Sequence, residues 1–243
     1  MTSRILLINP NISVDMTRLI VEQASKQAPS DVAFDSVTAS FGASVIASRA
    51  SYAIAAHAAL DCFARRGGKP AGIIVACFGD PGVQAIREMT SAPVIGLAEA
   101  SVRIAGRRKL PFAIVTAGLA WKPMLAEFVS LMPEVELFTG VYCVDATGTS
   151  VSREPDRFVS LIADQISKAQ ADGAETVILG GAALAGFASR LDGGPILIDC
   201  VAAAVTELLN AESPIRSVPD DPPPLPSIGL ADELAELLGR GKL

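Results

Sequence analysis

Short runs of Val, Ile and Leu alternate along the chain with stretches in which apolar residues recur at helical spacing. Strands that are buried on both faces are almost continuously apolar, so this alternation predicts parallel strands covered by helices, which is the α/β class. The expected strands are Ile5 to Ile8, Gly72 to Ala76, Pro93 to Leu97, Phe112 to Thr116, Val135 to Val144, Thr176 to Leu179 and Pro195 to Ile198.

Local signals predict where some helices begin and end. Apolar residues at helical spacing follow Ser13, which is expected to be an N-cap with Asp15 in the first turn. A second helix is expected to end with Arg65 and Arg66, two cations suited to its negative end, and Gly67-Gly68 supplies the left-handed stop.

The C-terminal part of the chain has a different character. The stretch Ser217 to Ser227 contains DDPPPLP, which excludes regular helix and central strand and predicts an extended linker. Leu230 to Leu238 then returns to helical spacing. We expect this short amphipathic tail to pack on the body of the protein or on another subunit, or to fray.

Composition limits the classes of function. With 243 residues, half of them hydrophobic, the chain can bury the core of one large α/β domain or of two small ones. The net charge is −6 and the lysines and arginines are scattered, so we expect no nucleic-acid partner. The chain starts without a secretory signal pattern and has no clear membrane span, so we expect a cytoplasmic protein without a membrane partner.

The four cysteines, Cys62, Cys77, Cys143 and Cys200, are widely spaced, and the chain has one histidine, His57. No Cys-x-x-Cys pair is present, so the pattern gives little support to a zinc site and we expect no metal. The cysteines are interpreted as free thiols, and all but Cys77 are expected to be buried structural residues. His57 lies within an alanine-rich predicted helix, where a structural role is favoured over a catalytic one.

Cys77 stands at the end of a predicted strand and begins the segment Cys77-Phe78-Gly79-Asp80-Pro81-Gly82. Asp80 is expected to cap a new helix, with Pro81 in its first turn. Free main-chain N–H groups and the positive end of that helix would lower the pKa of the thiol. The same N–H groups would hold a carboxylate or an enolate-like oxyanion, so this turn offers a base and an anion cradle together.

A weak internal repeat relates the two halves of the chain. IIVACFGDPG at residues 73–82 resembles VILGGAALAG at residues 177–186, and PVIGL resembles PILID at a nearly constant offset. Duplication would give two similar lobes whose strand ends line a shared cleft. Any two strand-turn-helix units rich in small residues also look alike, so the repeat by itself leaves duplication open.

Three segments resemble the signatures of hydantoin racemases within the aspartate/glutamate/hydantoin racemase superfamily. They are Ile8-Asn9-Pro10-Asn11 with Ser13 and Met16, Ala76-Cys77-Phe78-Gly79-Asp80-Pro81-Gly82, and Pro93-Val94-Ile95-Gly96-Leu97-Ala98-Glu99-Ala100. The resemblance runs from the N-terminus to about Val205. It implies two pseudo-symmetric lobes, each a mainly parallel four-stranded sheet flanked by helices, with the active site in the cleft between them. It also implies no metal or organic cofactor and a pair of cysteines that exchange a proton on opposite faces of the substrate.

The chain departs from this family in the second lobe. Where the family pattern reads Leu-Gly-Cys-Ala-Gly-Met, the chain has Leu179-Gly180-Gly181-Ala182-Ala183-Leu184. Gly181 therefore replaces the second catalytic cysteine, and a symmetric reaction with two thiols is not available unless another group or a water serves that face.

Three interpretations stay open. The first is a cofactor-independent racemase or epimerase that moves a proton at the carbon next to a carbonyl of a hydantoin or an amino-acid-like substrate, with Cys77 as the thiol acid/base. The second is a single-cysteine enzyme similar to arylmalonate decarboxylase or to maleate isomerase. The third is a catalytically inactive paralogue that binds a small molecule.

Position in the pattern suggests further residues of the cleft. Substrate contacts are expected from strand ends and turns, where Asn, Gly and Thr also serve ordinary backbone roles. These residues are Pro10, Asn11, Phe41, Gly42, Phe78, Gly79, Thr116, Gly118, Gly181 and Ala182. Glu99 matches the family pattern and is expected to open a helix with a favourable charge.

The expected partner is a small-molecule carboxylate or hydantoin substrate, and assembly into a homo-oligomer stays open. We expect residues 1–98 and 199–216 to form the first lobe, and residues 99–198 to form the second. Residues 217–243 are expected to form the proline-rich linker and the short C-terminal helix.

Overall fold

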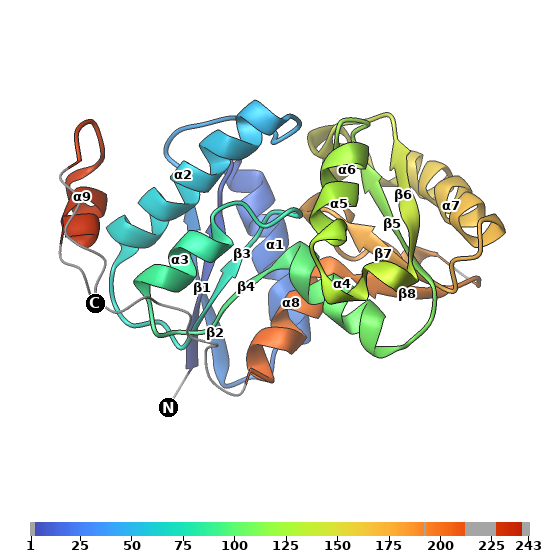
Figure 1. Ribbon diagram of the computed structural model, residues 1–243, viewed down its shortest axis with the longest axis horizontal. Coiled ribbons are helices and arrows are strands. Elements are labelled where there is room, and N and C mark those ends of the chain that lie inside the picture. The colour runs from blue at the N-terminus through green and yellow to red at the C-terminus, as the bar shows by residue number, and fades with distance from the viewer. Residues whose placement is uncertain (1–2, 192, 212–226, 240–243) are drawn as a thin grey trace.

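The computed structural model describes residues 3–191, 193–211 and 227–239. Figure 1 shows two α/β lobes, each built around one sheet. The first sheet has the order β2-β1-β3-β4 and the second has the order β6-β5-β7-β8, and every neighbouring pair is parallel. The strands are β1 (Ser3–Asn9), β2 (Val32–Thr38), β3 (Gly72–Val75), β4 (Val94–Gly96), β5 (Phe112–Ala117), β6 (Phe138–Val144), β7 (Thr176–Gly180) and β8 (Ile196–Asp199). The expected fold class of two lobes with four-stranded parallel sheets is confirmed, and the equal strand orders make β3 and β7 equivalent.

Helices cover the faces of both sheets (Figure 1). The α-helices are α1 (Val14–Gln27), α2 (Arg49–Arg66), α3 (Val83–Met89), α4 (Leu97–Arg107), α5 (Trp121–Ser130), α6 (Gly148–Arg153), α7 (Pro155–Ala171), α8 (Cys200–Leu209) and α9 (Asp232–Gly239). The described residues also form the short 3-10 helices η1 (Pro133–Leu137), η2 (Ala182–Leu184) and η3 (Phe187–Arg190). Within the described ranges, none of the helices combines the length and the apolar composition that a membrane crossing requires.

The predicted helix ends are confirmed in the first lobe. The Ser13 hydroxyl accepts a hydrogen bond from the Met16 N–H at 3.2 Å, and Asp15 lies in the first turn of α1. α2 ends with Arg65 and Arg66, and Gly67 follows with a φ of +56°. Both helices therefore begin or end where the local sequence satisfies their free main-chain groups.

Helices α4 and α8 join the two lobes. α4 packs against β4 of the first sheet and β7 of the second, and α8 contacts β3, β4, β7 and β8. One apolar cluster accordingly runs through both lobes, from Leu7 in β1 to Ile178 in β7. The packing of α8 on α1, β3 and β4 supports the proposal that the chain returns to the first lobe after β8.

The structure also corrects the predicted elements. The strand expected over Val135 to Val144 begins only at Phe138, because Pro133 starts the 3-10 helix η1 instead. The edge strand β2 was not expected at all. The C-terminal helix α9 packs on α2 with Leu234 buried, which confirms the first of the expected fates of the tail. The proline-rich stretch at residues 217–226 lies outside the described residues.

Candidate active site

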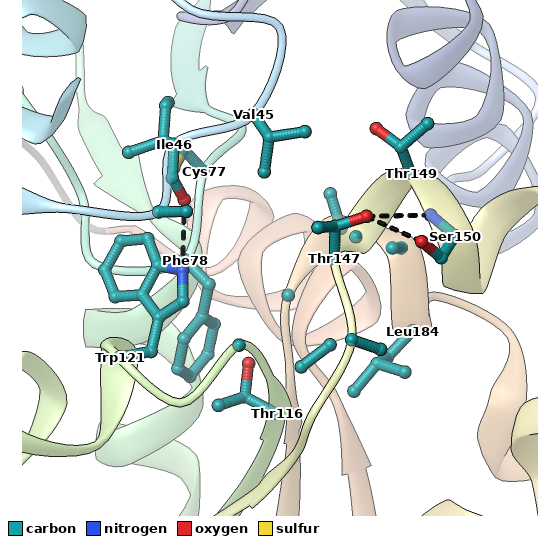
Figure 2. Close-up of a pocket in the computed structure, with 18 of the residues that line it drawn as sticks. Val45, Ile46, Cys77, Phe78, Thr116, Trp121, Thr147, Thr149, Ser150 and Leu184 are labelled. Carbon is teal, nitrogen blue, oxygen red and sulfur yellow. Dashed lines mark hydrogen bonds between the residues drawn. The ribbon is translucent and has the colours of Figure 1, made fainter.

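A cavity of about 440 Å³ lies where the C-terminal ends of strands from both lobes meet. Figure 2 shows Val45, Ile46 and Cys77 on one side and Thr147, Thr149 and Leu184 on the other. Asn11 after β1 and the main chain around Gly181 after β7 also line it. Strand ends from two parallel sheets therefore converge on one space, the usual position for a ligand in α/β proteins.

Cys77 follows β3 and begins a tight turn in which the Asp80 N–H donates to the Cys77 carbonyl at 3.0 Å. The residue is only 9% exposed, although it lines the cavity. Burial, with a further contribution from the charge of Asp80, raises the pKa of the Cys77 thiol. The expected lowering of this pKa by a helix end was therefore wrong. The reason is that α3 begins only at Val83, so the thiol is held in an apolar wall as the neutral acid.

Asp80 does not cap the helix that follows it, contrary to expectation. α3 has Gly82 as its N-cap without a side-chain hydrogen bond, and Pro81 lies in the turn before it. The Asp80 carboxylate instead accepts hydrogen bonds from the N–H groups of Ala98 at 2.9 Å and Glu99 at 2.7 Å, at the start of α4. Asp80 thus fixes the turn that carries Cys77 to a helix from another part of the chain.

Asp80 is a buried carboxyl group with a raised pKa. Burial raises its pKa to about 7, although the hydrogen bonds from Ala98 and Glu99 oppose the shift. The charge of Glu99, which opens α4 as expected and pairs with Arg87 and Arg103, adds to the increase. Asp80 also adopts a φ of +60°, a conformation that Asp tolerates better than most residues.

At the end of β7, two glycines face the first lobe. The ring of Phe78 lies against Gly180, where an added Cβ would come within 2.6 Å of the ring. Gly181 has a φ of +126°, and the nearest atom to a Cβ at this position would be the Thr116 hydroxyl oxygen at 3.6 Å. Gly180 therefore leaves room for Phe78, whereas the space beside Gly181 belongs to the cavity.

Trp121 at the start of α5 lines the cavity and connects the two lobes. Its indole N–H donates to the Ile46 carbonyl at 3.1 Å, as Figure 2 shows. The ring covers Gly79, whose carbonyl accepts a hydrogen bond from the Tyr52 hydroxyl at 2.7 Å. Tyr52 of the first lobe and Trp121 of the second lobe therefore both contact the turn after Cys77.

The structure separates the predicted site residues into two groups. Beside Cys77, the cavity is lined by Asn11, Phe78, Thr116, Gly118, Gly181 and Ala182. Four others, Pro10, Phe41, Gly42 and Gly79, do not line it. Phe41 packs on the ring of His57 at 5.0 Å between centroids, Gly79 lies under Trp121, Pro10 is buried, and Gly42 is exposed near Ile54. His57 lies outside the cavity as well.

Sequence reasoning missed several residues of the walls. Much of the surface comes from the loop at residues 44–47 and from residues 145–150, which lead into the first turn of α6, and Trp121 contributes its ring. Trp121 is the chain's only tryptophan and follows Gly118 closely after a predicted strand, a signal that could have located it. Neither segment has a periodic pattern, so nothing in the sequence placed them in the cavity wall.

Charge is scarce in the cavity. Of the described residues that line it, Cys77 and Asp145 are the titratable ones, and none is a lysine, arginine or histidine. Asp145 is exposed, whereas Cys77 is buried. In the described ranges, no group of three His, Cys, Asp or Glu side chains is arranged to hold a metal ion. The site is thus suited to proton transfer from a thiol beside an uncharged or weakly charged ligand.

Comparison with known proteins agrees with this architecture. The profile of the family described as Asp/Glu/Hydantoin racemase matches residues 5–208. Hydantoin racemase from Paenarthrobacter aurescens is 30% identical over 207 residues, which cover 83% of this chain and 87% of that protein. Hydantoin racemase from Pseudomonas sp. (strain NS671) is 30% identical over 209 residues, with 83% of each chain covered.

Solved structures show the same family likeness. Allantoin racemase from Klebsiella pneumoniae superposes with a TM-score of 0.79 at 28% identity, and the match covers 86% of each chain. The extent of these matches determines the class of enzyme. The chain belongs to the Asp/Glu/Hydantoin racemase family and is an isomerase of the racemase type.

Proposed function

We propose that the protein is a cofactor-independent racemase of 5-substituted hydantoins or closely related rings, with the Cys77 thiol as acid and base at the carbon next to the ring carbonyl. The observation that carries this proposal is the isolation of Cys77, the one buried titratable side chain among the described residues of the cavity. A proton at an acidic carbon needs one such group within reach on the face that it leaves.

The lack of cationic side chains among the described lining residues favours a ring over a free amino acid. An amino acid carries a full carboxylate, which normally requires a charged partner or several N–H donors when it leaves water. A hydantoin is uncharged, and hydroxyls and main-chain groups satisfy its carbonyls and N–H groups. The largely apolar wall formed by Val45, Ile46 and Leu184 suits its side group.

The raised pKa of Cys77 has a consequence for the reaction. In the free enzyme the thiol is protonated at neutral pH, so only a small fraction is the thiolate that removes a proton. Each thiolate is in turn a stronger base than an ordinary one, because basicity follows pKa. The rate of proton removal should therefore keep rising with pH through the neutral range instead of levelling off.

Proton NMR in heavy water tests the proposal. The enzyme is mixed with L- and D-5-substituted hydantoins, and loss of the ring C–H signal is followed after subtraction of the uncatalysed exchange. Cys77→Ala should lower the catalysed rate by about 10²-fold or more. Cys62→Ala is the matched control, because it removes another buried first-lobe thiol that does not line the cavity. Equal rates for wild type and Cys77→Ala would contradict the role of Cys77.

A second candidate is a one-sided decarboxylase, which the glycine at position 181 favours. Decarboxylation needs one stereospecific protonation, so a single thiol suffices. The substrate would be a malonate with two carboxylates, and the lining residues offer no cation for either of them. Release of carbon dioxide from α-aryl or α-alkyl malonates would favour this candidate over the racemase. Absence of turnover with hydantoins and malonates alike would favour a binding protein that has lost its activity.

A further inference from the structure

Racemisation requires a proton carrier on both faces of the reacting carbon, and Cys77 serves one face. The equal strand orders of the two sheets place Gly181 after β7 in the position that Cys77 occupies after β3. Both positions line the same cavity. The equal strand orders therefore lead us to expect glycine main chain across the cavity from Cys77, and this main chain carries no proton of its own that it can give to carbon.

Thr116 is the polar side chain at that wall. It lies in β5, paired in register with Gly180, and its hydroxyl oxygen would be 3.6 Å from a Cβ at position 181. The residue is 4% exposed, and its hydroxyl makes no hydrogen bond to a residue in the described part of the chain. Figure 2 shows the oxygen directed toward the space between Cys77 and Leu184.

The other polar side chains nearby are less suited to this role. The hydroxyls of Thr147 and Ser150 bond to each other at 2.8 Å (Figure 2). Cys200 is fully buried and does not line the cavity. Asp145 lines the cavity but is exposed to solvent. Thr116 is thus a nearly buried hydroxyl whose hydrogen-bonding capacity is free for a molecule in the cavity.

We propose that Thr116 is a positioning residue that holds a solvent water beside Gly181, and that this water exchanges the proton on the face opposite Cys77. This inference rests on the proposed racemase function. A water in this place accepts or donates one hydrogen bond at Thr116 and has further partners in the substrate carbonyls and in solvent. It occupies the space that a side chain at position 181 would fill.

The proton transfers balance without another reactant. The Cys77 thiolate takes the proton from carbon, so the C–H bond breaks, an S–H bond forms, and the electron pair stays on the enolate. The water then gives a proton to the other face of the same carbon and becomes hydroxide. Hydroxide takes the thiol proton through solvent, which restores the thiolate and the water. In the opposite direction the water-derived hydroxide removes the proton and the thiol supplies the new one.

The test compares racemisation with isotope exchange in heavy water, using both enantiomers of a 5-substituted hydantoin. Thr116→Val keeps the shape of the side chain and removes the hydroxyl. It should lower racemisation on the order of 10-fold or more relative to exchange with retention, because the Cys77 face continues to operate. Thr116→Ser restores the hydroxyl and should recover most of the ratio. Thr176→Val is the matched control, since it removes a buried hydroxyl at the far end of β7.

Each outcome separates the two proposals. If Thr116→Val lowers exchange and racemisation equally, or changes neither, Thr116 does not serve the second face. Wild-type exchange with retention and without racemisation would also overturn the inference while leaving Cys77 as the acid/base. A change of the ratio in Asp145→Asn instead of Thr116→Val would transfer the role to Asp145. Absence of any catalysed exchange in the wild type contradicts the proposed function itself.

Discussion

The turns after β3 and β7 occupy the same place in their sheets and are built differently. After β3, Cys77 begins a turn that is tied to the rest of the molecule by Phe78, by the carbonyl of Gly79 and by Asp80. After β7, the chain passes through Gly180 and Gly181 into η2, held by a main-chain bond from the Leu184 N–H to the Gly181 carbonyl at 2.8 Å. One turn positions a thiol, and the other leaves open space.

This difference teaches that symmetry of fold and symmetry of chemistry are separable. The two sheets have equal strand order, but the first lobe presents a thiol at this turn, where the second lobe has glycine, and its Phe78 packs against Gly180 of the second lobe. Phe78 packs where any side chain at position 180 would collide with it. Packing against Phe78 thus explains the glycine at position 180, whereas Gly181 borders the cavity. Substitutions at position 181 test its role separately from this packing.

The largest expected effect comes from Asp80→Asn, which disturbs the anchor of the first turn. Burial raises the pKa of Asp80 from the 3.8 of an ordinary aspartate to about 7. The pKa of Asp80 is higher in the folded state than in the unfolded state, so the folded protein binds the proton more tightly. Protonation of Asp80 therefore stabilises the fold fully below pH 4, and this stabilisation is lost as pH rises to 7. The change amounts to on the order of 4 kcal/mol.

Urea unfolding of wild type and Asp80→Asn at a series of pH values measures this effect. The difference in free energy of unfolding should shift in favour of the wild type as pH falls from 8 to 4, since asparagine does not titrate. Asparagine also tolerates the φ of +60°, so the backbone is preserved. A difference that stays constant over this range would contradict the raised pKa. Removing the charge should also lower the pKa of Cys77 and move the pH profile of exchange to lower pH.

A smaller effect is expected from Gly181→Ala and Gly181→Cys. A Cβ at this position would lie 3.6 Å from the Thr116 hydroxyl oxygen, an ordinary contact, but a φ of +126° is strained for any residue with a Cβ. Both variants should lose about 2 kcal/mol of unfolding free energy. The alanine variant measures this strain alone, so the pair isolates the effect of the thiol.

Gly181→Cys should then raise racemisation relative to exchange with retention, when compared with Gly181→Ala in the same heavy-water assay. A thiol at this position would face the substrate from the side opposite Cys77 and supply the second proton carrier. Equal ratios in two folded variants would show that position 181 does not lie opposite Cys77.

The sequence predicted the parts of the molecule that depend on local pattern. Runs such as Gly72 to Ala76 and Thr176 to Leu179 are buried on both faces, so their composition alone indicates central parallel strands. The place of Cys77 after one such strand followed directly. β2, by contrast, has the half-buried sequence VAFDSVT at the edge of its sheet, where polar residues are accepted and the apolar signal is weak.

The errors concern contacts between distant parts of the chain. Asp80 has the local appearance of a helix cap, but its partners are the N–H groups of α4, which only the folded sheet brings near. The pKa of Cys77 was predicted from the same mistaken helix end, whereas its burial depends on walls from both lobes. The segments at residues 44–47 and 145–150 are placed by tertiary packing in the same way.

The smallest effect tests the far end of β7, where Thr176 begins the strand. This residue is fully buried, and its hydroxyl oxygen has no hydrogen-bond partner among the described residues. An unsatisfied buried hydroxyl costs free energy that an isosteric methyl group does not. Thr176→Val should therefore raise the free energy of unfolding by about 1 kcal/mol without changing catalysed exchange.

The urea midpoint of Thr176→Val is compared with that of Thr139→Val, which makes the same change of side chain. The Thr139 hydroxyl, unlike that of Thr176, donates a hydrogen bond, to the Phe112 carbonyl at 3.1 Å. That variant should lose about 1 kcal/mol, since it removes a hydrogen bond that is made. A loss of stability in Thr176→Val would mean that its hydroxyl has a partner in solution. In the heavy-water assay, Thr176→Val should leave exchange unchanged, whereas Thr116→Val should change the ratio of racemisation to exchange. This pair of results would show that the second lobe takes part in the reaction only at the cavity end of its strands.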